Sequence, residues 1–395
     1  MTRPAQFLVP PGANSGPGVD ANLFGPLYIY GRCRRGNPNA GLILDAEGNL
    51  YSTTEGGGQY GCGVVFRLDP SGTETVLHSF NCQDEGGTPT AGVISDPNGL
   101  LFGTTYGGGS GGHGVVYRLD KNGQETVLHS FTGGSDGATV YAGLVRDSAG
   151  NLYGVTRDGG ADDRGVVYKV TKDGVESILH SFTGGSDGGS PYGTLILDAA
   201  GNLYGTTGGG GKLGGRICEN DPGLGCGVVF ELSPGGTGTV LETFGGGDGA
   251  NPWAGVIQNS KGNLFGTTTA GGDLGGDCRY FDGCGVVFEI ESSGTGKTIH
   301  KFTNRDGATP YGSLTLDTSG NLYGTVQYFN GAVFKIDPSG TETELYVFTG
   351  GTDGSGPISN AILDSAGNIY GTAPYSGLGA GCGDLGCGVV FKIAP

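Results

Sequence analysis

Aromatic side chains at one repeated position are the residues of this sequence best suited to bind a ligand. Each precedes a stretch resembling Ala-Gly-Leu-Ile-Leu-Asp, and each lies five residues after an acidic residue. Aromatic rings offer flat apolar faces on which planar groups stack. We therefore predict a ligand-binding arc formed by Tyr141, Tyr192, Trp253 and Tyr311. Packing of each ring against the neighbouring repeat is the alternative explanation.

Two polar residues, His113 and Arg164, stand at a second repeated position, directly before segments reading Gly-Val-Val-Tyr. Other copies hold Cys or Asn there, so this position varies within an otherwise constant pattern and is free to serve function. We predict that both belong to the ligand site, with solvated loop residues as the alternative. A further set of histidines shares one repeat position, and we interpret it as structural: His78, His129, His180 and His300.

The acids five residues before the aromatic arc are candidate cation ligands. Carboxylates suit hard cations such as Ca²⁺, and calcium is the one cofactor that the sequence leaves open. A glycine follows each acid, which favours a role in turns instead. These weak candidates are Asp136, Asp187, Asp248 and Asp306.

Nine cysteines indicate a disulfide framework. Three pairs are close in sequence, and each precedes a Gly-Val-Val-Phe segment: Cys218/Cys226, Cys278/Cys284 and Cys382/Cys387. Cys62 has no such neighbour, but antiparallel strands would bring it beside Cys82. We predict four bridges and an oxidising compartment. Cys33 is left over, and its pairing and the oligomeric state stay open.

The elements that position these residues form a sevenfold repeat. Each copy of about 50 residues holds four short β-branched or aromatic segments bounded by Gly, Asn, Asp and Pro, which is typical of strands. One copy reads Gly-Leu-Ile-Leu-Asp, Asn-Leu-Tyr-Gly-Thr-Thr, Gly-Val-Val-Phe and Val-Leu-His-Ser-Phe in turn. Four antiparallel strands per repeat indicate a propeller blade. Repeats begin near residues 40, 91, 142, 193, 254, 312 and 359.

The sequence therefore predicts an all-β, seven-bladed propeller over residues 26–395, after a Pro/Gly-rich tail or strap at 1–25. The last copy lacks its fourth segment, and a spare one lies at 27–30. We expect residues 27–30 to complete the last blade beside the strand near Val389–Phe391, which closes the ring and removes its open edges.

Composition narrows the functional classes. Glycine accounts for 88 of 395 residues, and the net charge is −17. An acidic chain without a basic stripe is a poor partner for nucleic acid. No apolar run is long enough for a membrane span, and residues 1–25 contain no apolar core of a signal peptide.

These repeats resemble the GloVer tandem repeat and, more distantly, NHL-type propeller repeats, over residues 26–395. The resemblance implies a secreted or surface-exposed bacterial protein with a propeller fold, and it transfers no catalytic motif. We expect an extracellular, cell-surface or periplasmic module that binds carbohydrate or protein through its loop-rich face. The alternatives are a polysaccharide lyase or glycoside hydrolase using His113, Arg164 and a Tyr of the arc, or a structural scaffold.

Overall fold

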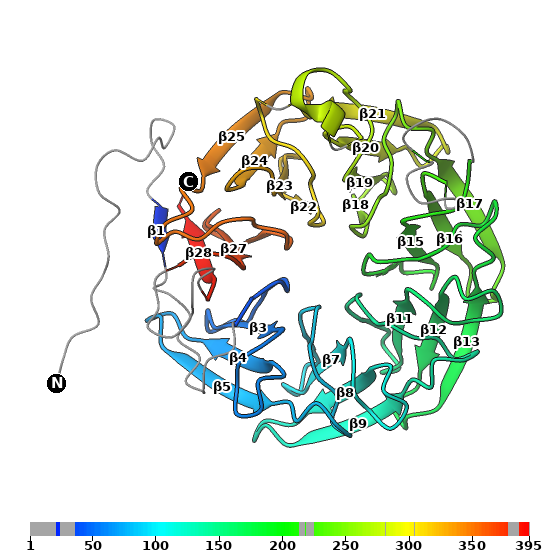
Figure 1. The fold of residues 1–395 in the computed structure, drawn as a ribbon, viewed down its shortest axis with the longest axis vertical. Helices are drawn as coiled ribbons and strands as arrows, with labels where there is room; N and C mark the ends of the chain where they lie inside the picture. The colour runs from blue at the N-terminus through cyan, green and yellow to red at the C-terminus, as the bar shows by residue number, and fades with distance from the viewer. Residues whose placement is uncertain are drawn as a thin grey trace.

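The computed structural model describes residues 21–23, 36–212, 218, 225–280, 282–303, 305–377 and 387–394, the first of these segments as backbone only. Seven four-stranded antiparallel sheets surround a central channel (Figure 1). The short first strand of each repeat lies innermost and the long fourth strand outermost. This confirms the seven-bladed, all-β prediction.

The strands of blades 1 to 3 follow the repeat. Blade 1 contains β2 (Ile43–Leu44), β3 (Leu50–Thr54), β4 (Val64–Leu68) and β5 (Glu74–Ser79). Blade 2 contains β6 (Ile94–Ser95), β7 (Leu101–Thr105), β8 (Val115–Leu119) and β9 (Glu125–Ser130). Blade 3 contains β10 (Val145–Arg146), β11 (Leu152–Thr156), β12 (Val166–Val170) and β13 (Glu176–Ser181).

Blades 4 to 6 repeat this order. Blade 4 contains β14 (Ile196–Leu197), β15 (Leu203–Thr207), β16 (Val228–Leu232) and β17 (Gly238–Thr243). Blade 5 contains β18 (Ile257–Gln258), β19 (Leu264–Thr268), a 3-10 helix η1 (Gly276–Tyr280), β20 (Val286–Ile290) and β21 (Gly296–Lys301). Blade 6 contains β22 (Thr315–Leu316), β23 (Leu322–Val326), β24 (Ala332–Ile336) and β25 (Glu342–Val347).

Blade 7 joins the two ends of the chain. It contains β26 (Ile362–Leu363), β27 (Ile369–Ala373), β28 (Val389–Ile393) and the N-terminal β1 (Ala21–Leu23). β1 pairs antiparallel with β28, with Ala21 opposite Ile393 and Leu23 opposite Phe391. Closure by an N-terminal strand is therefore confirmed, and the residues of that strand that the structure describes are Ala21–Leu23. The closing strand predicted at 27–30 stays a prediction. Residues 27–30 lie outside the described residues.

Tight turns join the first and second strands of each blade. In blade 1 the backbone N–H of Asn49 donates to Asp45 Oδ1 at 2.7 Å, and the Tyr51 hydroxyl donates to Asp45 Oδ2 at 3.0 Å. Partial burial opposes ionisation, but these hydrogen bonds hold the pKa of Asp45 below its usual range. This repeated Asp therefore caps the turn between the first two strands.

A triplet that reads Gly-Thr-Thr in blades 2, 4 and 5, with one residue changed in the other blades, packs each blade and links it to the next. A Cβ at Gly266 would approach Phe288 Cζ to 2.5 Å, so only glycine leaves room for that ring. The first Thr donates to the following blade's innermost segment, as in Thr53 Oγ1 to the Ala91 carbonyl at 2.9 Å. At the closing seam Thr372 Oγ1 donates to the Ala40 carbonyl at 3.1 Å. The second Thr holds the following loop, as in Thr105 Oγ1 to the Gly107 carbonyl.

Edge-to-face aromatic pairs fill six of the seven seams between blades. A buried Phe ends or follows each outer strand and meets the aromatic residue of the next blade's third strand. Phe80 lies 5.1 Å from Tyr117, and Phe182 lies 5.2 Å from Phe230, between ring centroids. Such pairs contribute about 0.5–1.5 kcal/mol beyond the area they bury. The remaining pairs are Phe131–Tyr168, Phe244–Phe288, Phe302–Phe334 and Phe348–Phe391.

Three predicted disulfides are present: Cys62–Cys82, Cys218–Cys226 and Cys278–Cys284. Cys387 is also disulfide-bonded, but its predicted partner Cys382 lies outside the described residues, as does Cys33. The bridges agree with an oxidising compartment. In the part of the chain that the structure describes, no helix is long and apolar enough to cross a membrane.

Glutamates at the start of four outer strands lie in the seams. Glu74, Glu125, Glu176 and Glu342 each have at least one carboxylate oxygen that is buried without a hydrogen-bond partner among the described residues. Burial raises the pKa of Glu74 to about 7. Burial and then Asp306 raise the pKa of Glu342 to about 7. These side chains therefore oppose folding once they ionise.

Removal of β1 should open blade 7. A truncation of residues 1–24 exposes the β28 edge and should lower the free energy of unfolding by on the order of several kcal/mol. A truncation of residues 1–20 is the matched control, and the difference in melting temperature between the two isolates β1. Equal melting temperatures would contradict this closure.

Loss of a bridge should cost stability in proportion to the loop that it closes. The Cys62–Cys82 bridge spans 20 residues and Cys278–Cys284 spans 6. We expect Cys62→Ser/Cys82→Ser to lose roughly 3 kcal/mol and Cys278→Ser/Cys284→Ser to lose less, because the longer loop restricts the unfolded chain more. Urea unfolding measures both, and the reverse order would contradict the prediction.

Stability should fall as pH rises above about 5. The folded-state pKa values of Glu74 and Glu342 are raised to about 7, above the unfolded value of about 4.3. The folded chain therefore holds extra protons between these values, and its stability is lost as pH rises toward about 8. The capped aspartates act in the opposite direction, but below about pH 4. Glu342→Gln should flatten the dependence in thermal melts; an unchanged slope in that variant would refute this.

Candidate functional site

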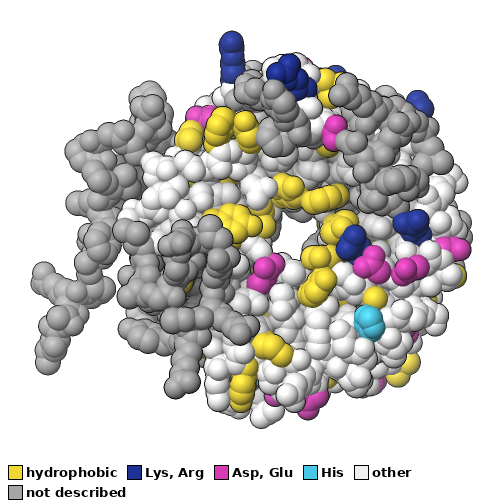
Figure 2. Space-filling model, viewed as in Figure 1, with side chains coloured by type: hydrophobic (Ala, Val, Ile, Leu, Met, Phe, Trp, Pro, Cys, Tyr) yellow, Lys and Arg dark blue, Asp and Glu magenta, His cyan; other side chains and the backbone are white. Residues whose placement is uncertain are grey.

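A cavity of about 660 Å³ occupies the central channel. The innermost strands and the segments that lead into them form its wall. Figure 2 shows hydrophobic side chains bordering the opening on one face of the ring. The cavity is lined by the residue that every blade places at the repeated position of the aromatic arc: Asn39, Thr90, Tyr141, Tyr192, Trp253, Tyr311 and Ile358.

The four aromatic residues predicted from the sequence form one continuous row at this mouth. Tyr192 and Trp253 are stacked, with centroids 5.0 Å apart and planes at 25°. Tyr141 lies 5.2 Å from Tyr192, and Tyr311 lies 5.3 Å from Trp253. All four side chains are half-buried. The rings therefore pack on one another, as the alternative explanation held, and also remain accessible to a ligand.

A second ring of residues, which sequence reasoning missed, follows the Gly-Thr-Thr triplets. Tyr106 extends the aromatic row, with its ring 5.0 Å from Tyr141. The guanidinium of Arg157 lies over the Tyr192 ring at 5.4 Å, a cation–π contact. A Cβ at Gly208 would lie 3.0 Å from Trp253 Nε1, so this glycine makes room for the indole. The signal was available, because this position varies more widely than the preceding triplet, which keeps at least one threonine in every blade.

Polar groups gather opposite the aromatic row. Glu55 lines the cavity and hydrogen-bonds Asn39. Burial raises the pKa of Glu55 and the Asn39 bond opposes that shift. Asn39 Oδ1 is buried and accepts no hydrogen bond from the described residues. This side of the mouth therefore presents the Glu55 carboxylate, an acceptor that suits hydroxyl or ammonium donors.

The hydroxyl groups of Tyr141 and Tyr311 remain neutral donors at physiological pH. Burial, followed by the neighbouring Tyr106, raises the pKa of Tyr141 to about 12. Burial and then Tyr375 raise the pKa of Tyr311. The mouth thus combines apolar rings and neutral hydroxyls with an acid, an amide and one arginine.

The structure does not bring His113 and Arg164 to this cavity. The His113 imidazole packs directly on Gly133, and a Cβ at Gly184 would lie 3.0 Å from Arg164 Cγ. Each therefore covers the glycine turn that follows its own blade's outer strand, as the Cys62–Cys82 bridge does covalently in blade 1. Neither is among the described residues that line the channel.

The predicted cation ligands serve as turn caps on separate blades. Asp136 accepts hydrogen bonds from the backbone and hydroxyl of Thr132 at 2.8 and 2.6 Å. Asp306 caps Thr303 in the same way, and Asp248 accepts from the Gly245 N–H at 2.8 Å. Asp187 likewise caps Thr183. This agrees with the turn role; the calcium alternative stays a prediction.

Comparison with solved structures gives the fold. Two structures of the extracellular domain of a "putative" one-component or hybrid two-component system of B. thetaiotaomicron match 93% and 92% of this chain, at 15% and 9% identity and TM-scores of 0.55 and 0.58. The chain spans about 40% of the length of those proteins. A "putative" 6-phosphogluconolactonase from Bacteroides uniformis matches 82% of this chain and 88% of its own, at 15% identity and a TM-score of 0.52. At such identities only the propeller fold is shared.

Comparison of the sequence itself is more specific. No curated protein matches the chain. A family model described as the Gloeobacter/Verrucomicrobia repeat matches residues 24–218 and 219–385. These two stretches cover most of the 395 residues and all of the blades' repeated segments up to the last loop. The chain therefore belongs to the Gloeobacter/Verrucomicrobia repeat family.

Proposed function

We propose that this protein is a non-catalytic binding module that takes a carbohydrate at the mouth of its central channel. The observation that carries the proposal is the row of half-buried aromatic rings from Tyr106 to Tyr311. The apolar face of a sugar ring packs well on such side chains. The cavity of about 660 Å³ lies within the range of small-ligand sites.

The unequal distribution of residues around the mouth supports this class of ligand. Every blade supplies one residue at the same position, yet aromatic rings occupy blades 3 to 6 and polar groups occupy blades 1 and 2. A sugar has apolar C–H faces and hydroxyl donors, so it matches both sides. The Glu55 carboxylate, which lines the cavity on the polar side, is an acceptor for those hydroxyls.

The negative charge of the protein narrows the class of ligand further. The chain carries a net charge of −17, and an acid lines the channel. Neutral or cationic carbohydrates therefore meet less repulsion than polyanions do. The disulfides favour a secreted or surface-exposed location for this module.

The lyase or hydrolase alternative finds no specific support in the geometry. It required His113 and Arg164 beside a tyrosine of the arc, and these two residues cover turns away from the cavity lining. A protein ligand at the same mouth remains the other class to test, and a screen that includes peptides separates it from carbohydrate.

Trp253 is the only tryptophan of the chain, so its fluorescence reports on the mouth directly. A bound glycan should shift or quench this emission. Trp253→Ala should weaken binding by about 2 kcal/mol, roughly 30-fold, if the indole is a hot spot. Because the Trp253 ring is only half-buried, its removal should lower the free energy of unfolding by less than the roughly 3–5 kcal/mol typical of a fully buried aromatic ring. Calorimetry and thermal melts measure the two effects.

Tyr60→Ala is the matched control, because Tyr60 is 56% exposed and does not line the cavity. It should leave glycan affinity unchanged. If Trp253→Ala binds every glycan hit as the wild type does, the proposed function is wrong.

A further inference from the structure

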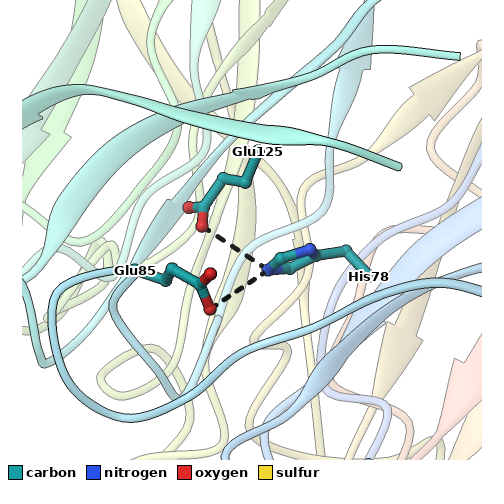
Figure 3. Close-up of side chains that lie close together, drawn as sticks. All are labelled: His78, Glu85 and Glu125. Carbon is teal, nitrogen blue, oxygen red and sulfur yellow. Dashed lines mark ion pairs between the residues drawn. The ribbon is translucent and has the colours of Figure 1, made fainter. Parts of the chain in front are cut away.

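A histidine and two glutamates meet on the outer side of the seam between blades 1 and 2 (Figure 3). His78 comes from β5, Glu85 from the loop that follows it, and Glu125 from the first residue of β9. His78 Nε2 lies 3.5 Å from Glu125 Oε2 and 3.9 Å from Glu85 Oε2. Each residue turns one ligand atom toward the others, and these atoms lie within 4.8 Å of one another.

Glu125 is the unusual member of this cluster. Its side chain is 3% exposed, and neither carboxylate oxygen accepts a hydrogen bond. Burying a carboxylate without hydrogen-bond donors is costly, and such groups are normally paired or bound to a cation. Apart from His78, the ionisable groups that face Glu125 are the acids Glu85 and Asp84 and the hydroxyl of Tyr117. The acidic neighbours Glu85 and Asp84 therefore make the electrostatic potential at Glu125 more negative.

His78 is oriented as a metal ligand would be. Its Nδ1 lies 3.3 Å from the Gly123 carbonyl, which can accept the Nδ1 proton. That tautomer leaves a lone pair on Nε2, which is buried and makes no hydrogen bond. A hydrogen bond from the other ring nitrogen to a backbone carbonyl is the usual support of a metal-bound imidazole.

Glu85 differs from its counterparts in the other blades. The carboxylates of Asp136, Asp306 and Asp353 each accept hydrogen bonds from the backbone N–H and the hydroxyl of a turn threonine. In blade 1 that turn begins with Asn81, whose Oδ1 accepts the Gln83 N–H at 2.8 Å. Among the described residues no hydrogen-bond donor reaches the Glu85 carboxylate, which is left with only its contact to His78.

We propose that His78, Glu85 and Glu125 form a binding site for a divalent transition metal, with Zn²⁺ as the best fit. Ligand atoms about 2.0–2.2 Å from a tetrahedral zinc ion lie roughly 3.4 Å from one another. The two distances from His78 Nε2 are 3.5 and 3.9 Å, so an ion fits after small side-chain movements. Ca²⁺ fits less well because it takes six to eight oxygen ligands. Glu85 is 38% exposed, which gives the ion a route from solvent and leaves a position for water.

Equivalent seams provide internal comparisons. Between blades 3 and 4 the position of Glu125 is taken by Gly238, and a cavity of about 110 Å³ beside His180 and Asp187 replaces the carboxylate. Between blades 2 and 3, His129 and Glu176 are retained, but Thr132 engages Asp136. Among the described residues, His78, Glu85 and Glu125 are the one group of three such side chains whose ligand atoms come this close. The proposal therefore predicts a single site, at the seam between blades 1 and 2.

The test is metal binding by the full chain after treatment with a chelator. Isothermal titration with Zn²⁺ should give one ion per chain and a raised melting temperature. Glu125→Gln and Glu85→Gln should each weaken binding by at least about 10-fold, since each removes a ligand. Glu85 is exposed, so its variant keeps the test valid if Glu125→Gln folds poorly. Ca²⁺ should bind more weakly than Zn²⁺.

Glu176→Gln is the matched control at the next seam and should bind Zn²⁺ as the wild type does. Titration with Co²⁺ identifies the ligand type, because thiolates give an intense near-ultraviolet charge-transfer band and imidazole with carboxylates does not. The proposal is overturned if Zn²⁺ does not bind, if both glutamine variants bind it with wild-type affinity, or if the Co²⁺ spectrum shows thiolate ligation.

Discussion

The contact between successive blades is the interaction on which the rest of this structure depends. At six seams a buried Phe from one blade meets an aromatic edge or face of the next, and threonine hydroxyls bind the neighbouring carbonyls beside them. Each seam joins only two blades, so the ring becomes rigid when the last seam closes. There Leu42 and Phe66 of blade 1 pack with Tyr370 and Val390 of blade 7.

A closed ring places equivalent positions of all blades at one channel mouth. The glycines and threonines of the triplets serve packing, so the residues just beyond them are free to vary. Tyr106, Arg157 and Gly208 occupy such positions, and each contributes to the aromatic row in its own way. The mouth is thus a sevenfold frame with an asymmetric lining, apolar on one side and rich in acceptors on the other.

The outer side of the same seams is lined by carboxylates and histidines, in contrast to the aromatic rings at the channel mouth. Four outer strands begin with a glutamate, and blade packing removes these carboxylates partly from water. Where a turn threonine satisfies the neighbouring acid, as at Asp136, the arrangement is a structural cap. At Glu85 and Glu125 that compensation is missing, and His78 faces both. One repeated framework therefore offers an apolar site at the centre and a polar one at the rim.

The sequence by itself determined the blade number, the strand composition, three bridges and the aromatic row, because these follow from local patterns repeated seven times. It predicted closure by an N-terminal strand but not the pairing of Ala21–Leu23 with β28, since a three-residue strand has no sequence pattern of its own. It also grouped His113 and Arg164 with the arc. Only the tertiary structure decided that these cover glycine turns and that Glu55 reaches the channel. It likewise brought His78 and Glu125 together, because side chains 47 positions apart meet only when two blades pack.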